Sequence, residues 1–343
     1  MEPIFERTFD ASELMRVHPL RLMERNKQIV FEVACPTNSP HSGTISFARY
    51  RSSVLPQSLP AESDTALEHH EGIFEYEPYV AASGRVDWHL NFANTDLFCA
   101  YGKRAFAQDE LQVGEHPALG AVREALLASS RNQLFVVEQR EPTPITIMGV
   151  ERRCEINTAP DAAAGQPNGL YGRLFCNASP NVIRSVTRPI QPPTISNILA
   201  IEAPSNGKGR YTRAQIEIIL QTAYSGFRAA QLESQRRLEN NRDAVVIHTG
   251  FWGCGVYGND RVLIALLQIL AARLARLDRL VFHTVNETGT TAYKQAQSII
   301  NDKLLSAGLI QRLVRVVPKE KELAWVLAQI DQIGFQWGES DGN

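Results

Sequence analysis

Residues 248–261, HTGFWGCGVYGNDR, place Gly253, Gly255 and Gly258 in a G-x-G-x-x-G arrangement. The preceding AVVIH predicts a strand, and the following DRVLIALLQILAARLARL predicts a helix. A glycine-rich turn between such elements directs backbone N–H groups and the positive end of the helix toward one point. The arrangement predicts an anion site, most usefully for a pyrophosphate, although glycines also permit tight strand–helix packing.

A nicotinamide-dependent oxidoreductase would need more than this loop. Such a fold places an acidic residue about 20 positions further on, at the end of its second strand, to bind the ribose hydroxyls. Asp278 has that spacing, but it precedes the strand LVFHTV instead of ending it. The loop also comes too late in the chain for the rest of a double mononucleotide fold. An oxidoreductase is therefore the weakest of the functions that we consider.

The elements around the loop alternate between strand and helix. We expect strands at 86–94, 134–139, 145–150, 197–204, 244–248, 280–285 and 313–317, helices at 117–129, 212–231 with Thr212 as N-cap, 260–277, 292–308 and 319–333, and a loop-rich stretch at 157–193. Almost uninterrupted apolar strands in such an order predict a mainly parallel sheet with helices on its faces. Residues 1–85 mix short patterns and turns, and they define no element clearly.

Composition favours a folded protein with a small-molecule or protein partner. The 343 residues are 44% hydrophobic, and 35 Lys plus Arg against 37 Asp plus Glu leave a net charge of −2. Because the chain has no excess of basic residues, we expect no strong electrostatic binding of nucleic acid. No window resembles a membrane span or a secretory signal, so we expect a cytoplasmic protein without a membrane partner. The five cysteines are scattered, and we expect no disulfide framework, no metal site and no cofactor.

The glycine loop and its helix resemble the diphosphate-binding segment of the poly(ADP-ribose) glycohydrolases, whose pattern is close to T-G-N-W-G-C-G-A-F-G-G-D. Two upstream segments are similar in the same order: ILAIEAP followed by QTAYSGF, and LNFANTDLFCAYGKRAFAQDELQ, where residues 95–107 separate Asn94 from Gln108 as in the family. The resemblance spans about residues 86–317. It implies a three-layer α/β/α macrodomain-like sandwich over 86–343, with a mixed, mainly parallel sheet, and it leaves residues 1–85 as an N-terminal accessory segment packing on that domain.

The resemblance implies hydrolysis of the ribose–ribose glycosidic bond in ADP-ribose chains. A carboxylic acid must protonate the departing oxygen and then, as a carboxylate, activate water. Glu110 matches the catalytic glutamate and Asp109 its orienting or ribose-binding neighbour. Without the resemblance, Gln108-Asp109-Glu110 would be interpreted as the charged start of a surface helix. The substrate-binding residues that the resemblance implies are Asn94, Gln108, Thr249, Gly250, Phe251, Trp252, Gly253, Cys254, Gly255, Val256, Tyr257 and Gly258.

The chain departs from the family pattern in three places. Phe98-Cys99-Ala100 stands where the family has Gly-Gly-Gly, so the backbone is less able to approach a ribose or phosphate, and a positive φ becomes costly there. Phe251 replaces the asparagine of T-G-N-W. A family tyrosine pair falls near Val150, Glu151, Arg152, Arg153 and Ile156, so adenine stacking of that type is not preserved.

We therefore interpret the sequence as an ADP-ribosyl glycohydrolase for poly- or mono-ADP-ribosylated substrates, with ADP-ribose or an ADP-ribosylated macromolecule as its partner. The alternative is a non-catalytic module that binds ADP-ribose or a nucleotide diphosphate, as a reader or an immunity-type protein. His248 and His283 flank the glycine loop, and we interpret them as packing residues in preference to catalytic ones.

Overall fold

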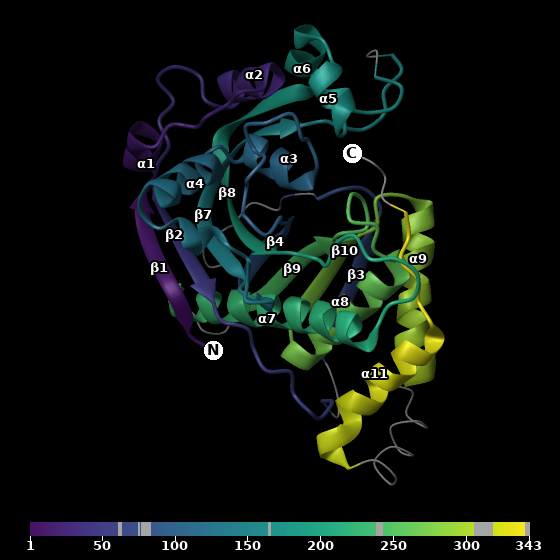
Figure 1. Cartoon of the computed structure of the whole chain (residues 1–343). Helices are drawn as coiled ribbons and strands as arrows, with labels where there is room; N and C mark the ends of the chain where they lie inside the picture. Colours follow the sequence, from purple (N-terminus) through teal and green to yellow (C-terminus); the bar gives the residue numbers. More distant parts are fainter. Residues whose placement is uncertain are drawn as a thin grey trace.

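The computed structural model describes residues 1–60, 64–74, 76, 84–163, 166–237, 243–304 and 318–339. Within these residues an eight-stranded sheet runs in the order β1-β2-β7-β8-β4-β9-β10-β3 (Figure 1). Its strands are β1 Pro3–Asp10, β2 Thr44–Tyr50, β3 Ala66–His70, β4 Arg85–Phe92, β7 Ile145–Ile156, β8 Thr187–Ile201, β9 Ala244–Gly250 and β10 Arg279–His283. The neighbours from β8 through β4, β9 and β10 to β3 pair in parallel, and the other pairs are antiparallel. The mixed, mainly parallel sheet is confirmed.

Helices cover both faces of the sheet and make the three-layer sandwich that the sequence predicts. One apolar core joins β4, β8, β9 and β10 to α7 Arg213–Arg237, α8 Arg261–Ala275, α9 Glu287–Ser298 and α11 Glu322–Ile333. A second core on the other face joins β1, β2, β7 and β8 to α1 Ala11–Val17, α3 Gln108–Glu115 and α4 Ala118–Ser129. A third cluster brings together α2 Arg25–Ala34, α5 Arg173–Asn177 and α6 Pro180–Val186, which group at one end of the molecule (Figure 1).

The remaining elements are short. They are η1 Arg131–Leu134, the two-stranded pair of β5 Val137–Glu138 and β6 Glu141–Pro142, η2 Ile299–Leu304 and η3 Lys319–Lys321. The sequence predicts a strand over 134–139, but Leu134 ends η1, Phe135 forms an isolated bridge with Asp96, and a strand forms only over Val137–Glu138. The expected strand LVRVV, at 313–317, lies outside the described residues.

Strand β4 shows how the sequence orients the sheet. Val86, Trp88 and Leu90 belong to the core under α7 and α8. The alternate side chains point to the other face, and they are the buried polar residues Asp87, His89 and Asn91. Strands of a parallel sheet are usually apolar on both faces, because helices cover both. The polar face of β4 therefore indicates that this side of the strand is not covered by an apolar core alone.

The N-terminal segment takes part in the sheet, which the sequence does not reveal. β1 and β2 form one edge beside β7, and β3 forms the other edge beside β10. The described part of residues 1–85 thus contributes the strands β1, β2 and β3 to the sheet. The division of the chain into folding units at residue 85 stays a prediction.

The expected loop-rich stretch 157–193 contains α5, α6 and the first residues of β8. Its proline-rich segment RPIQPP belongs to β8. This strand begins at Thr187, ten residues before the start at 197 that the sequence predicts. β4 pairs only with the later residues of β8, from Asn197 to Ile201. The prolines therefore lie where β8 has one neighbour, β7, and they remove no hydrogen bond from a second ladder.

Candidate active site

A cavity of about 1390 Å³ opens where the parallel strands β4, β9 and β10 end. Its walls come from the residues after β4, the first residues of α3, the loop after β9 and the segment 155–177. In an open α/β sheet the carboxyl ends of the strands are where ligands bind. The cavity is larger than the 300–1,000 Å³ of most small-molecule sites.

The glycine loop, residues 251–260, connects β9 to α8 in a conformation that needs glycine. The φ angles of Gly253 and Gly258 are 72° and 68°, in the left-handed region that glycine enters without strain. A Cβ on Gly253 would lie 2.4 Å from the Cβ of Ala203. Gly253 is therefore required by both its backbone angle and its neighbour.

Buried side chains hold the loop in place from behind. Trp252 is fully buried, and its indole N–H donates to the Ile201 carbonyl over 3.1 Å. The Asn259 amide donates to the carbonyls of Pro204, over 2.8 Å, and of Gly253, over 3.0 Å. Asp260 accepts from the Leu263 N–H at 2.8 Å and so caps α8. Hydrogen bonds within the protein therefore fix the conformation of the loop.

The start of α3 is tied to the end of β4. The Gln108 amide accepts from the Phe92 N–H at 2.8 Å and donates to the Leu90 carbonyl at 2.9 Å. Asn91 lies between these two residues of β4, and its amide donates to Asp109 Oδ1 at 3.0 Å and to Gln112 Oε1 at 2.9 Å. These bonds aim the first turn of α3 at the cavity.

Asp109 and Glu110 form a buried pair of carboxyls on that turn. Both line the cavity and each is only 6% exposed. Burial, and then the charge of Glu110, raise the pKa of Asp109 to about 8. Glu110 Oε2 accepts from the Ala107 N–H at 2.7 Å, which fixes the orientation of its carboxyl. The Asp109 carboxyl therefore holds a proton near neutral pH.

A hydrogen bond joins the two motifs across the cavity. The Asn94 amide donates to the Tyr257 hydroxyl over 3.2 Å, although 163 positions separate the two residues. Asn94 follows β4 and Tyr257 lies in the glycine loop, and both line the cavity. The carboxyl pair and the glycine loop therefore belong to one site.

Segment 98–100 makes another part of the same wall. Phe98 has a φ of 58°, in the left-handed region, and its ring is fully buried in the core with α4. A left-handed conformation costs a non-glycine residue about 1–2 kcal/mol. Cys99 and Ala100 follow on the cavity wall. The backbone has the angle expected of a glycine, and the side chain meets that requirement by packing inward.

Part of the chain matches a known protein family. Residues 170–292 match the family model "Poly (ADP-ribose) glycohydrolase (PARG), Macro domain fold". These residues are thus similar to the macrodomain-fold region of the poly(ADP-ribose) glycohydrolases. The matched residues include the glycine loop, all of α8 and the strand β10. Poly(ADP-ribose) glycohydrolases are glycosidases.

Solved structures of poly(ADP-ribose) glycohydrolases are also similar to this chain. The enzyme from Thermomonospora curvata has 16% sequence identity and a TM-score of 0.44, with 85% of each chain covered. The same enzyme bound to the inhibitor ADP-HPD has 19% identity and a TM-score of 0.43, with 67% of this chain and 78% of that chain covered. The enzyme from Deinococcus radiodurans in complex with ADP-ribose has 13% identity and a TM-score of 0.41, with 86% and 95% covered.

The structure brings most residues suggested by the poly(ADP-ribose) glycohydrolase pattern to one cavity. Those that line it are Asn94, Gln108, Asp109, Glu110, Gly250, Phe251, Trp252, Gly253, Cys254, Gly255, Val256 and Tyr257. Thr249 and Gly258 lie behind the wall. The Thr249 hydroxyl donates to Gln268 Oε1, and the Gly258 carbonyl accepts from the Gly338 N–H at 2.9 Å. The roles of all these residues in binding and catalysis stay predictions.

The positions that depart from the glycohydrolase pattern are also occupied. Phe251 packs edge-on against Phe282 at 5.0 Å between ring centroids, and the Arg261 guanidinium lies 5.2 Å from its ring. Arg152 lines the cavity, stacks over the Tyr76 ring at 4.6 Å and pairs with Glu115 at 3.0 Å. Arg152 and Tyr76 thus form an arginine–tyrosine stack on the cavity wall.

The two histidines beside the loop lie in a packed row. His248 bonds to Asp87 at 2.8 Å and approaches His283 at 3.3 Å. Burial, helped by His248 and His70, lowers the pKa of His283 to about 3, so that ring is neutral at neutral pH. Asp278, the acidic residue that an oxidoreductase would need for ribose, accepts from the Val245 N–H at 2.8 Å and serves the sheet.

Several contributors escaped the sequence reasoning. Phe74 and Tyr76 line the cavity, and Asn91 holds Asp109. One signal was present for Asn91, because the alternation of Asp87, His89 and Asn91 in β4 marks a polar strand face. Among the described residues no cluster of His, Cys, Asp or Glu is placed to hold a metal ion. A search of the described helices finds none with the length and apolarity needed to cross a membrane.

Proposed function

We propose that this chain is an ADP-ribosyl glycohydrolase that cleaves a ribose glycosidic bond in poly- or mono-ADP-ribosylated substrates, in a cytoplasmic setting. One observation carries the proposal: two buried carboxyls, Asp109 with a raised pKa and Glu110 beside it, share a cavity with a glycine loop at a helix N-terminus. The Asn94–Tyr257 bond ties the two parts together. The family match covers the loop half of this arrangement.

The glycine loop supplies the diphosphate site in this proposal. Backbone N–H groups near the start of α8 attract an anion, because they carry the partial positive charge of the helix end. Gly253 and Gly255 leave room for phosphate oxygens at the wall. With the diphosphate there, the ribose reaches toward Asn94 and the carboxyl pair.

Glu110 acts as the general acid and then the general base. Its carboxylic acid protonates the departing oxygen as the bond from that oxygen to the anomeric carbon breaks, which relieves the charge on the leaving group. Water then attacks the anomeric carbon and gives its proton to the Glu110 carboxylate. The products are ADP-ribose and the acceptor hydroxyl. Asp109, held by Asn91, orients the ribose.

The proposal is tested by substituting Glu110 with glutamine. Glu110→Gln keeps the size of the side chain and its place beside Ala107, so we expect the protein to fold and to bind ADP-ribose. We expect the rate of ADP-ribose release to fall by about 10²–10⁴-fold. Release is measured by mass spectrometry on a panel of poly- and mono-ADP-ribosylated proteins and nucleic acids. Glu13→Gln, an exposed site on α1, is the matched control.

A binding module remains the second candidate, and one observation favours it. Glu110 already accepts a hydrogen bond at the start of α3, and the side chains of Cys99 and Ala100 stand on the wall where the glycohydrolase pattern has glycines. Wild-type protein that binds ADP-ribose but releases none from any linkage would establish the module and reject the enzyme. Because these side chains narrow the wall, we also expect slower turnover of long polymer than of shorter or differently linked substrates.

A further inference from the structure

Lys27 is a buried cation behind the candidate active site. It lies in the first turn of α2, in the N-terminal segment, and is 6% exposed. Its ammonium donates to the Ala100 carbonyl over 3.1 Å and lies 6.0 Å from the Phe106 ring. A buried charge is costly unless other groups compensate it. Lys27 therefore needs a reason to be there.

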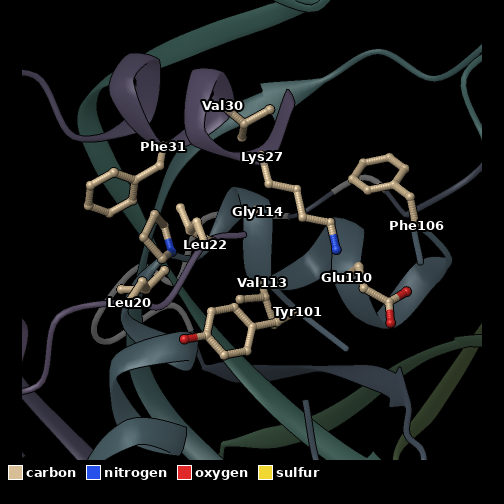
Figure 2. Close-up of a pocket in the computed structure, with 11 residues that line it drawn as sticks. Leu20, Leu22, Lys27, Val30, Phe31, Tyr101, Phe106, Glu110, Val113 and Gly114 are labelled. Carbon is tan, nitrogen blue, oxygen red and sulfur yellow. The ribbon is translucent and has the colours of Figure 1, made fainter. Parts of the chain in front are cut away.

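The side chain of Lys27 extends toward Glu110. Figure 2 shows the ammonium coming down from α2 to the side of α3 that carries Glu110. Both residues line a cavity of about 20 Å³ whose other walls include Leu20, Leu22 and Val113. That space is enough for about one water molecule. Because Lys27 and Glu110 are both buried and the rest of the lining is mostly apolar, the charge on Lys27 is weakly screened from Glu110.

Glu110 also faces the large cavity, so it separates the substrate side from the Lys27 side. Lys27 is thus placed to influence the carboxyl pair without touching a substrate.

The charged groups around Lys27 are mostly acidic. Burial lowers the pKa of Lys27, and Glu110, Cys176, Asp109 and Glu24 oppose that shift. Glu24 precedes α2 and accepts from the Lys27 N–H at 3.0 Å, so it is occupied as a helix cap. Lys27 and, more weakly, Arg123 in turn oppose the rise in the pKa of Asp109. The cation and the carboxyl pair therefore act on each other.

We infer that Lys27 is a positioning residue of the active site, which holds the carbonyl of Ala100 in the divergent segment and places a positive charge behind the carboxyls of Asp109 and Glu110. The inference rests on the proposed function for its catalytic meaning. A cation in that place favours the ionised form of the buried Asp109 carboxyl, and its removal would favour the neutral form further.

Three variants separate the charge of Lys27 from its hydrogen bond. Lys27→Met removes both, Lys27→Gln keeps a donor for Ala100 without charge, and Lys27→Arg keeps the charge. Replacing a buried charge with an apolar side chain of similar length is often tolerated, and thermal unfolding checks that each variant folds. Lys294→Met, at an exposed site on α9, is the matched control for loss of one positive charge.

The first readout needs no activity. Carbon-13 NMR titration of the Asp109 and Glu110 carboxyls, with resonances assigned through Asp109→Asn and Glu110→Gln, measures the apparent pKa values of the pair. We expect the pKa of Asp109 to rise by about one unit or more in Lys27→Met and Lys27→Gln, and to stay near the wild-type value in Lys27→Arg and Lys294→Met. Unchanged titration in the two uncharged variants would overturn the inference.

The second readout is the pH profile of ADP-ribose release. We expect both limbs of the profile to move to higher pH in the uncharged variants, with kcat reduced at neutral pH and KM little changed. A role in folding alone would not move the profile. If wild-type protein releases no ADP-ribose while the titration shifts, the proposed function fails and the electrostatic role of Lys27 stands. If release occurs and neither titration nor profile shifts, the inference fails and the proposed function stands.

Discussion

The glycine loop and segment 98–100 face the same cavity and use left-handed backbone in different ways. Gly253 in the loop has a φ of 72°, and Phe98 has a φ of 58°. At Gly253 a Cβ would collide with Ala203. At Phe98 the side chain points into the core with α4 and is fully buried. A left-handed angle alone does not require glycine; the space in the direction of the Cβ decides whether a side chain is tolerated.

The largest effect expected from this comparison is at Phe98. Phe98→Ala removes a buried ring and should lower the free energy of unfolding by about 3–5 kcal/mol. Phe98→Gly removes the same ring but relieves the left-handed strain, so it should be more stable than the alanine variant by about 1 kcal/mol. Urea unfolding of both variants measures the difference. Equal stabilities would show that Phe98 carries no strain and would break the comparison.

A smaller effect is expected at Gly253. Gly253→Ala puts a Cβ at a left-handed angle and against Ala203, and should lower the free energy of unfolding by about 2 kcal/mol. Ala203→Gly removes the collision with the Ala203 Cβ, but not the left-handed angle or the 2.8 Å approach to Asn259 Nδ2. In urea unfolding, the double variant should therefore be more stable than the sum of the single effects predicts. Strict additivity would show that the backbone angle alone makes Gly253 necessary.

The smallest effect is expected at Gly255, which lines the cavity. Gly255→Val puts a branched side chain where backbone would meet phosphate, and we expect ADP-ribose affinity to fall by about tenfold, which is about 1.4 kcal/mol. Calorimetric titration gives the affinity, and the thermal midpoint should stay close to that of the wild type. An unchanged affinity would mean that the glycine loop does not contact the ligand at this point.

The sequence predicts the local parts of this protein well. β9, the glycine loop and α8 are consecutive, and their signals are strand periodicity, glycines and the cap Asp260. The predicted helix at 117–129 appears as α4 Ala118–Ser129 for the same reason. In each case the interactions that decide the structure lie within a few residues of one another. Such signals can be read from a single chain.

Parts that depend on distant partners were not predictable. Lys27 bonds to Ala100, 73 positions away, and nothing in the residues around Lys27 names that carbonyl. The place of β3 beside β10 is likewise a pairing of Ala66 with Arg279 and their neighbours. For the candidate site, the cavity-lining residues of the loop and of α3 came from the family resemblance. The residues that orient them, Asn91 among them, face the site from separate elements.

The edge position of β3 has a consequence for how the chain is made. Synthesis proceeds from the N-terminus at about 5–20 residues per second, so β3 emerges long before β10, the only strand that the described sheet places beside it. Until β10 appears, the backbone groups of β3 have no sheet to join. β3 can therefore join the sheet only after β10 has been synthesised. This edge of the sheet forms late, although β3 is one of the first strands in the chain.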